Sequence, residues 1–182
     1  IVTEVDRPMA VGLALASLAL LVPGTAEARA KAVEPYKVLV VTSTQDELST
    51  AGVNAITAAV GDDGEVTAPA PAAVGAEFTP EALDKYQAVV FLNTGQASPL
   101  NDTQRANFEA YYKNGGGFVG IGSAIETDAS WSFYSDLLGA RSSGRTANQA
   151  ATIKVIDRVH DASKEFPHYW ERSEPYYNFN RN

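Results

Sequence analysis

Three short runs of apolar residues, each followed by a polar loop, constrain the fold of this chain more than any other feature. They are YKVLVVTS (36–43), QAVVFLN (87–93) and GFVGI (117–121). Runs rich in β-branched and aromatic residues, without polar alternation, are typical of strands buried on both faces. Helical patterns separate the three runs. Strands that alternate with helices predict βαβ units and a mainly parallel sheet with helices on both faces.

Start and stop signals bound the helices between these strands. Asn101 and Gln104 form a capping-box pattern, and Thr79 followed by Pro80 gives an N-cap with proline at the first helical position. Helices are predicted over residues 48–60, 79–86, 101–114 and 130–138. The remaining predicted segments are a weak strand over 65–70, a Pro- and Ala-rich loop over 68–77 and a strand over 151–157.

The sheet also predicts where a ligand would lie. In open sheets of this kind, ligands bind beyond the carboxyl ends of the strands. That rule selects four loops, which begin at Ser43, Asn93, Gly122 and Asp157. Since 182 residues with 45% hydrophobic residues are enough for one substantial core, we expect a single domain to carry all four loops.

The loop at Gly122 has the form of a strand-to-helix elbow, GIGSA (120–124). An elbow of the G-x-S-x-G kind holds its nucleophile at the middle position, which is Gly122 here, and Ser123 comes one residue later. One interpretation is that Ser123 or the backbone N–H groups of the turn hold an anion or a hydroxyl group; the other is a tight turn whose glycines allow close helix–strand packing or a positive φ. The dinucleotide fingerprint and the phosphate-loop lysine are absent, so no nucleotide cofactor is predicted.

Two carboxylates and an aromatic residue follow the elbow. Glu126 and Asp128 are candidates for acid–base chemistry or for a hard cation. The alternative is that Asp128 or Thr127 caps the next helix and that Glu126 is solvated. Trp131 is a candidate for stacking on a sugar ring, whereas Phe133 is assigned to the core.

The two histidines, His160 and His168, are eight residues apart, and the chain has no cysteine. This spacing does not place both imidazoles on one helical turn, so no metal site is predicted. His160 follows the last predicted strand and is the better placed of the two. A triad of Ser123, His160 and an acid stays open, because triads are assembled in space and not by spacing.

Charge and the N-terminal segment bear on partners and location. A net charge of −8 argues against nucleic acid and anionic membranes, and a neutral sugar fits this balance. Arg7, the apolar run 9–22 and the small-residue sites at 26–30 have the order of a secretory signal peptide. We predict a signal peptide over 1–30, a domain over 31–182 that is truncated at its C-terminus, and a secreted product without a membrane anchor after cleavage. A buried core helix or a membrane anchor is the alternative for 9–22.

Four segments give the chain a family resemblance from about Tyr36 to Asn182. They are YQAVVFLNTGQASPLNDTQRANFEAYYKNGGGFVGIGSA (86–124), WSFYSDLLGAR (131–141), ATIKVIDRVHDAS (151–163) and YWERSEPYYNF (169–179). With these, the chain resembles the trehalose-utilisation, ThuA-like family. The resemblance implies a class I glutamine amidotransferase-like fold, which is a flavodoxin-like three-layer α/β sandwich, and a role in the use of trehalose-type sugars. It also implies a fused carbohydrate-active domain as a partner, since similar secreted members with GIGSA often belong to larger proteins.

The chain departs from that family at three places. Members commonly carry a histidine where this chain has Gly122, and many carry a second histidine in the loop that corresponds to Ser142–Gln149. The usual acidic pair before the last aromatic residues appears as Glu174 followed by Pro175. These losses remove side chains that the family chemistry would use.

Two functions are carried forward, and whether the chain is an enzyme is left open. The first is a secreted module that binds a sugar or a partner domain at the strand-end cleft and lacks the elbow nucleophile. The second is an enzyme that acts on a glycoside or keto-sugar with Ser123, Glu126 and His160. No cofactor or metal is predicted for either. The predicted ligand-binding residues are Asn93, Thr94, Gly122, Ser123, Glu126, Trp131 and Tyr177.

Overall fold

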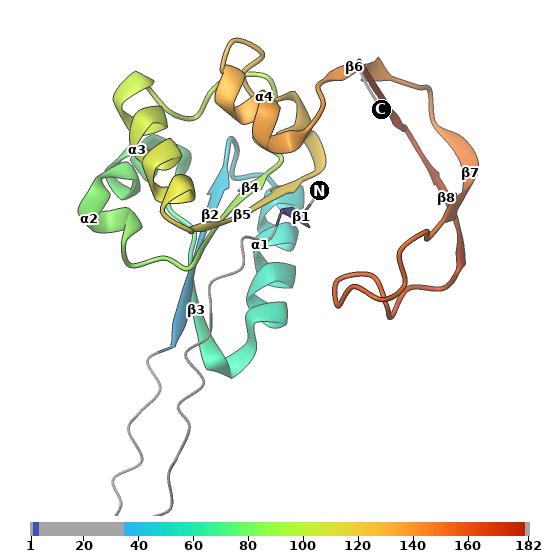
Figure 1. Ribbon diagram of the computed structural model, residues 1–182, viewed down its shortest axis with the longest axis horizontal. Coiled ribbons are helices and arrows are strands. Elements are labelled where there is room, and N and C mark those ends of the chain that lie inside the picture. The colour runs from blue at the N-terminus through green and yellow to red at the C-terminus, as the bar shows by residue number, and fades with distance from the viewer. Residues whose placement is uncertain (1, 4–34, 181–182) are drawn as a thin grey trace, which may run out of the picture.

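A five-stranded sheet lies at the centre of the computed structural model, which describes residues 2–3 and 35–180 (Figure 1). The strand order is β1-β5-β4-β2-β3. The strands are β1 Val2–Thr3, β2 Tyr36–Thr42, β3 Gly64–Thr67, β4 Ala88–Leu92 and β5 Gly117–Ile121. Strands β2 to β5 pair in parallel, and β1 pairs antiparallel with β5. The predicted parallel α/β sheet is confirmed.

Helices cover both faces of this sheet. The α-helices are α1 Glu47–Val60, α2 Pro80–Leu83, α3 Asp102–Lys113 and α4 Ser132–Leu138. Residues 35–180 also contain three 3₁₀ segments: η1 Gly61–Asp63, η2 Pro71–Phe78 and η3 Gly122–Glu126. Helix α1 lies on one face, and α2, α3 and α4 lie on the other (Figure 1). This is the flavodoxin-like three-layer arrangement that the sequence predicts.

The core is different on the two faces of the sheet. Towards α3 and α4 it is aromatic, and the ring of Phe91 lies 5.6 Å from Phe108, 5.5 Å from Phe118 and 5.6 Å from Tyr134, centroid to centroid. Towards α1 it is aliphatic, with Val38, Val40, Val90 and Leu92 buried against the helix. Burying one such large side chain contributes about 1.5–3 kcal/mol, so these contacts dominate the stability of the fold.

Side-chain caps confirm two of the predicted helix starts. The capping box of Asn101 and Gln104 is present, with both hydrogen bonds formed at 2.9 and 3.0 Å. Thr79 caps α2 through its side chain.

The segment predicted as a loop over 68–77 is instead largely the 3₁₀ segment η2. Its Val74 and Phe78 are fully buried, and this packing holds the Pro- and Ala-rich chain against the core.

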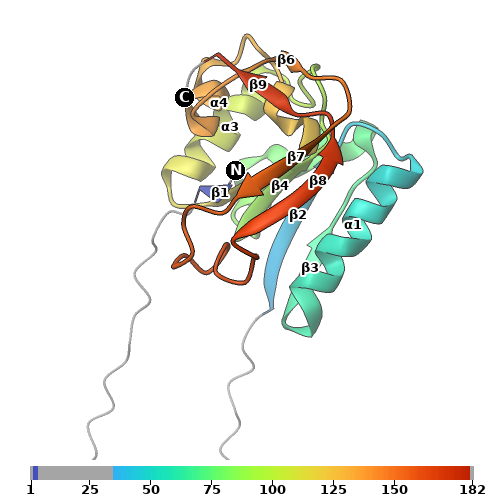
Figure 2. The same ribbon diagram turned by 90° about the vertical axis from the view of Figure 1, so that its right-hand side faces the viewer.

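Beyond α4 the chain forms two antiparallel ribbons that stand apart from the sheet (Figure 1). Their strands are β6 Ser142–Arg145, β7 Gln149–Lys154, β8 Tyr169–Glu174 and β9 Tyr177–Phe179. Strand β6 pairs with β9, and β7 pairs with β8. Figure 2, turned by 90°, shows the β7–β8 ribbon in front of the central strands.

The predicted strand over 151–157 is therefore real in part but belongs to no parallel sheet. It runs from Gln149 to Lys154 and pairs only with β8. A strand inside a parallel sheet needs apolar residues on both faces, whereas β7 leaves four of its six residues exposed. The expectation that the loop at Asp157 lies with the other strand-end loops was wrong for this reason.

The predicted signal peptide over 1–30 lies outside the described residues, apart from Val2 and Thr3, whose backbone pairs with Val119 and Phe118 of β5. Within the part of the chain that the structure describes, no helix is both long and apolar enough to cross a membrane.

Candidate functional site

The elbow after β5 is built together with the end of β4. Asn93 has φ 50° and Gly122 has φ 62°, so both adopt left-handed backbone conformations. The Asn93 N–H donates to the Ile121 carbonyl at 3.1 Å, and the Ser123 N–H donates to Asn93 Oδ1 at 3.2 Å. The Ser43 hydroxyl donates to the Asn93 carbonyl at 3.0 Å. Three of the four predicted strand-end loops therefore meet at Asn93.

Gly122 is required at this point by more than its φ angle. A Cβ built on Gly122 would collide with Oδ1 of Asn93. The space that a side chain at the elbow tip would need is thus filled by a carboxamide from the neighbouring strand. The turn keeps its shape without a reactive group of its own.

Ser123 and Thr94 connect the same two loops. The Ser123 hydroxyl accepts a hydrogen bond from the Gly95 N–H at 3.2 Å. The hydroxyl of Thr94, which is only 1% exposed, lies 2.5 Å from the hydroxyl of Thr127. Thr94 is closed off from ligands by this burial, and Ser123 is engaged in holding the loop after β4.

Glu126 ends η3 and is held by an arginine of the first ribbon. Arg145 of β6 donates from Nε to Glu126 Oε1 at 3.2 Å and from Nη2 to Oε2 at 2.5 Å. Its guanidinium carbon also lies 4.5 Å from the centre of the Tyr177 ring on β9. The hydrogen bonds to Glu126 raise the pKa of Arg145, and burial raises the pKa of Tyr177. This clasp of Glu126, Arg145 and Tyr177 ties the β6–β9 ribbon to the elbow.

Asp128 forms a structural ion pair with Arg105 and is not a free acid. Its carboxylate lies 2.6 Å from Nη2 of Arg105 and accepts from the Ser130 N–H and hydroxyl at 3.1 and 2.6 Å. Burial acts to raise the pKa of Asp128, but the Ser130 hydrogen bonds and the Arg105 charge outweigh it and hold that pKa below its usual value. The predicted alternative, in which Asp128 or Thr127 caps the next helix, is wrong, because α4 begins after Trp131 without any side-chain cap.

Trp131 belongs to the core. Its side chain is 5% exposed, its ring stacks on Tyr134 at 5.2 Å between centroids, and its Nε1 donates to Glu109 Oε1 at 3.0 Å. A ring buried in this way presents no face to a cleft. The prediction that Trp131 stacks on a sugar is corrected accordingly, because an aromatic residue beside a strand end looks the same in sequence whether it faces inward or outward.

His160 lies in the loop between β7 and β8, on the ribbon that stands apart from the sheet (Figure 1). Its backbone N–H donates to Asp157 Oδ1 at 3.2 Å, and its Nδ1 accepts from the Ala162 N–H at 3.1 Å. The other histidine, His168, stacks on Tyr169. Among the residues that the structure describes, no group of three or more His, Cys, Asp or Glu could hold a metal ion.

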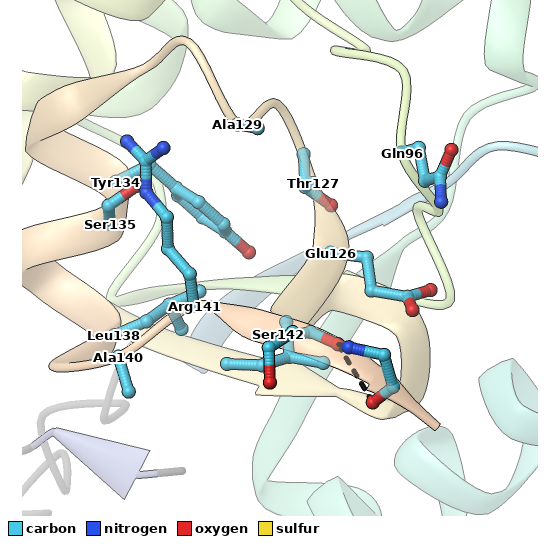
Figure 3. A pocket seen from close by; sticks show the side chains of 13 residues that line it. Gln96, Glu126, Thr127, Ala129, Tyr134, Ser135, Leu138, Ala140, Arg141 and Ser142 are labelled. Atoms are coloured by element: carbon cyan, nitrogen blue, oxygen red, sulfur yellow. Dashed lines mark hydrogen bonds between the residues drawn. The ribbon is translucent and has the colours of Figure 1, made fainter. Parts of the chain in front are cut away.

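A cavity of about 600 Å³ lies between η3, α4 and β6, beside the elbow (Figure 3). Glu126 and Arg141 stand on opposite sides of it. Arg141 donates from Nε to the Ser135 hydroxyl at 2.6 Å, and the Tyr134 hydroxyl donates to the Ala124 carbonyl at 2.9 Å. The residues that line the cavity are Gln96, Ile125, Glu126, Thr127, Ala129, Tyr134, Ser135, Leu138, Ala140, Arg141, Ser142, Ser143 and Gly144.

A second cavity of about 210 Å³ is mostly apolar, and Gly122 of the elbow lines it together with Tyr177 and Phe179 of β9. The predicted ligand residues are therefore divided among four places. Glu126 lines the larger cavity, Gly122 and Tyr177 line the smaller one, Trp131 is in the core, and Asn93, Thr94 and Ser123 build the turn.

Sequence reasoning missed Arg141, Ser135 and Gln96. Arg141 follows the helix-stop residue Gly139, and its only sequence signal is a cation just past a helix that starts near the elbow. That signal is weak, because a basic residue near a helix C-terminus usually serves the helix itself.

Two solved structures share this fold. A ThuA-like protein from Bacteroides uniformis ATCC 8492 matches with a TM-score of 0.64 and 21% identity, over 83% of this chain and 64% of that chain. A ThuA-like protein from Parabacteroides merdae ATCC 43184 matches with a TM-score of 0.61 and 17% identity, over 80% of this chain and 63% of that chain. The chain thus spans less than two thirds of the length of these structures. A comparison with curated proteins finds no match.

The sequence itself carries the family assignment. A family model described as ThuA, trehalose utilisation, matches residues 37–182, which is most of the chain. The resemblance read from the sequence is thereby confirmed, and the chain belongs to the ThuA, trehalose-utilisation, family.

Proposed function

We propose that this chain is a sugar-binding domain and that it holds its sugar in the cavity between Glu126 and Arg141. The observation that carries the proposal is the cavity itself. Its volume of about 600 Å³ lies within the usual range for small-molecule sites, and it is next to the carboxyl ends of β4 and β5, where ligands bind in sheets of this kind. Membership of the ThuA family supports a carbohydrate as the ligand.

The lining suits a sugar. A pyranose presents hydroxyl groups around its edge and C–H groups on its faces. Gln96, Ser142 and Ser143 offer hydrogen-bonding groups, while Ile125 and Leu138 offer apolar contact. A site that combines a few polar groups with apolar walls is typical of small-molecule recognition.

Binding is favoured over catalysis by the state of the three candidate catalytic residues. Ser123 accepts a hydrogen bond from Gly95, Glu126 is paired with Arg145, and His160 sits on the distant ribbon loop. Of the three, only Glu126 lines the larger cavity. An enzyme acting on a glycoside or keto-sugar would have to bring them together by a rearrangement. The same proposal covers a longer protein that contains this domain. In such a protein, a fused carbohydrate-active domain would be the partner of this sugar-binding domain.

The test uses the purified chain and calorimetric titration with trehalose, glucose and a 3-keto-glucoside, followed by analysis of the products. Exposed Ala129 lines the cavity, so Ala129→Trp should fill its mouth and weaken binding at least tenfold. Exposed Ala55 on α1, on the other face of the sheet, is the matched control, and Ala55→Trp should leave binding unchanged. Turnover that disappears in Ser123→Ala would overturn the binding role and establish the enzyme instead.

We also propose that residues 1–30 direct export. Fusion of this segment to a reporter should give an exported product cleaved after Ala28 or Ala30, as read by mass spectrometry of its N-terminus. Retention of the uncleaved reporter inside the cell would contradict the proposal. An Arg7→Glu variant, which removes the basic residue before the apolar run, should reduce export.

A further inference from the structure

Resting on the proposed sugar site, we propose a narrower ligand class: the cavity binds a sugar acid, a uronate or aldonate, whose carboxylate is held by Arg141. The first observation is the state of the arginines. Ion pairs within 4.0 Å engage Arg105, Arg145 and Arg172, but among residues 35–180 no carboxylate forms such a pair with Arg141. Arg158 shares this property, but it lies in the exposed β7–β8 loop.

The second observation is how Arg141 is held. Its backbone N–H donates to Asn180 Oδ1 at 2.9 Å, and its Nε donates to the Ser135 hydroxyl at 2.6 Å. Ser135 is 8% exposed and anchored in turn to the Trp131 carbonyl at 3.2 Å. The guanidinium is thereby fixed through Nε. Its two terminal nitrogens are left to donate hydrogen bonds to the two oxygens of a carboxylate, in the bidentate geometry that arginine favours.

The third observation is the charge balance around the cavity. The carboxylate on the opposite wall, Glu126, already receives two hydrogen bonds from Arg145. The remaining charge that faces the cavity is therefore the cation of Arg141. A protein with a net charge of −8 repels anions in general. A fixed cation inside a cavity offsets this repulsion locally, so the cavity favours an anion that also fits its shape.

These three observations define the ligand. Its carboxylate pairs with Arg141, and its hydroxyl groups reach the polar groups of Ser142 and Gln96 around the same cavity (Figure 3). A neutral sugar of the same size would leave the guanidinium without its partner after water has been displaced. The site should therefore discriminate between two sugars that differ only by this carboxylate.

Glucuronate and glucose are two sugars that differ in this carboxylate. Calorimetric titration of the full chain at pH 7 in low salt compares their affinities. Glucuronate should bind at least tenfold more tightly than glucose, and added salt should weaken only glucuronate binding. Arg141→Gln should remove the tenfold preference, and Arg141→Lys should keep part of it, because a lysine retains the charge but not the planar pair of donors. Arg158→Gln is the matched control and should change neither affinity.

The outcomes separate this inference from the function on which it rests. Equal binding of glucose and glucuronate would overturn the sugar-acid inference and leave a neutral sugar site intact. Binding of neither sugar would overturn the proposed function itself. Glucuronate binding that is unchanged in both Arg141 variants would place the ligand elsewhere, and acetate binding as tight as glucuronate would show a carboxylate site without sugar recognition. Thermal melts of Arg141→Gln and Arg141→Lys establish that each variant is folded before its affinity is interpreted.

Discussion

Asn93 and Gly122 share one space at the carboxyl ends of β4 and β5. The Oδ1 atom of Asn93 accepts the Ser123 N–H at 3.2 Å and stands where a Cβ at Gly122 would have to lie. Family resemblance leads one to expect a histidine at the position of Gly122. The structure explains how the turn is kept without it, because a carboxamide from the adjacent strand replaces the missing side chain as the group that closes the elbow.

Gly122→Ala should therefore destabilise the fold through two separate effects. The left-handed φ of 62° costs an alanine about 1 kcal/mol, and the collision with Asn93 should bring the total to about 2–3 kcal/mol. Gly139→Ala is the matched control, since its φ is 78° but a Cβ there meets nothing within 4 Å. In the Gly122→Ala background, Asn93→Gly should recover the collision part. Urea unfolding measures all four proteins, and equal costs for the two alanine variants would contradict this account.

The fold was predictable because its signals are local and redundant. The apolar runs at 36–43, 87–93 and 117–121 each become a sheet strand, and the capping box at Asn101 starts α3 where expected. The 3₁₀ segment 71–78 was not predicted because repeated prolines are typical of loops, and only the burial of Phe78 against the sheet reveals its role. Strand β7 was misplaced because a single strand pattern does not say which strand will pair with it.

The site was less predictable than the fold. Its elbow follows from the strand order, but the direction of each side chain does not. Trp131 turns inward, and Arg141 lines the cavity from a position that carried only a weak signal. The pairing of Glu126 with Arg145 joins residues 19 apart across a ribbon that spacing alone could not place. Function at a strand end depends on such tertiary contacts, which sequence periodicity does not encode.

The clasp of Glu126, Arg145 and Tyr177 should hold the β6–β9 ribbon in place. Arg145→Gln and Glu126→Gln should each speed hydrogen exchange and proteolysis in residues 142–179, while the central sheet keeps its protection. Because the Arg145 side chain is 43% exposed, solvent screening should limit the coupling energy from a double-mutant cycle to about 1 kcal/mol. Arg172→Gln, which breaks a pair within β8, is the control. Unchanged ribbon exchange in both clasp variants would refute the role of this pair.

Asp128 and Arg105 should make stability depend on acid. Because the folded-state pKa of Asp128 lies below its unfolded value of about 3.9, its contribution is present above that value and is lost as pH falls through the folded-state pKa. Asp128→Asn, which tolerates the φ of 44°, should cost about 3 kcal/mol at pH 7 and flatten the fall in stability below pH 4. Guanidinium unfolding between pH 2 and 7 tests this. A variant whose stability falls as steeply as that of the parent would show that other carboxylates cause the acid sensitivity.

The two tryptophans, Trp131 and Trp170, give a direct test of the corrected role of Trp131. The ring of Trp131 is buried against Tyr134, whereas Trp170 lies on β8 under the guanidinium of Arg172, 4.6 Å from its carbon. In Trp170→Phe the remaining emission should be blue-shifted and resist acrylamide, and in Trp131→Phe it should be red-shifted and easily quenched. Sugar added to Trp170→Phe should not produce the stacking-induced quenching that a ring facing the ligand would give. Strong quenching of Trp131 by both acrylamide and sugar would return this residue to the binding surface and displace the cavity beside Arg141 as the site.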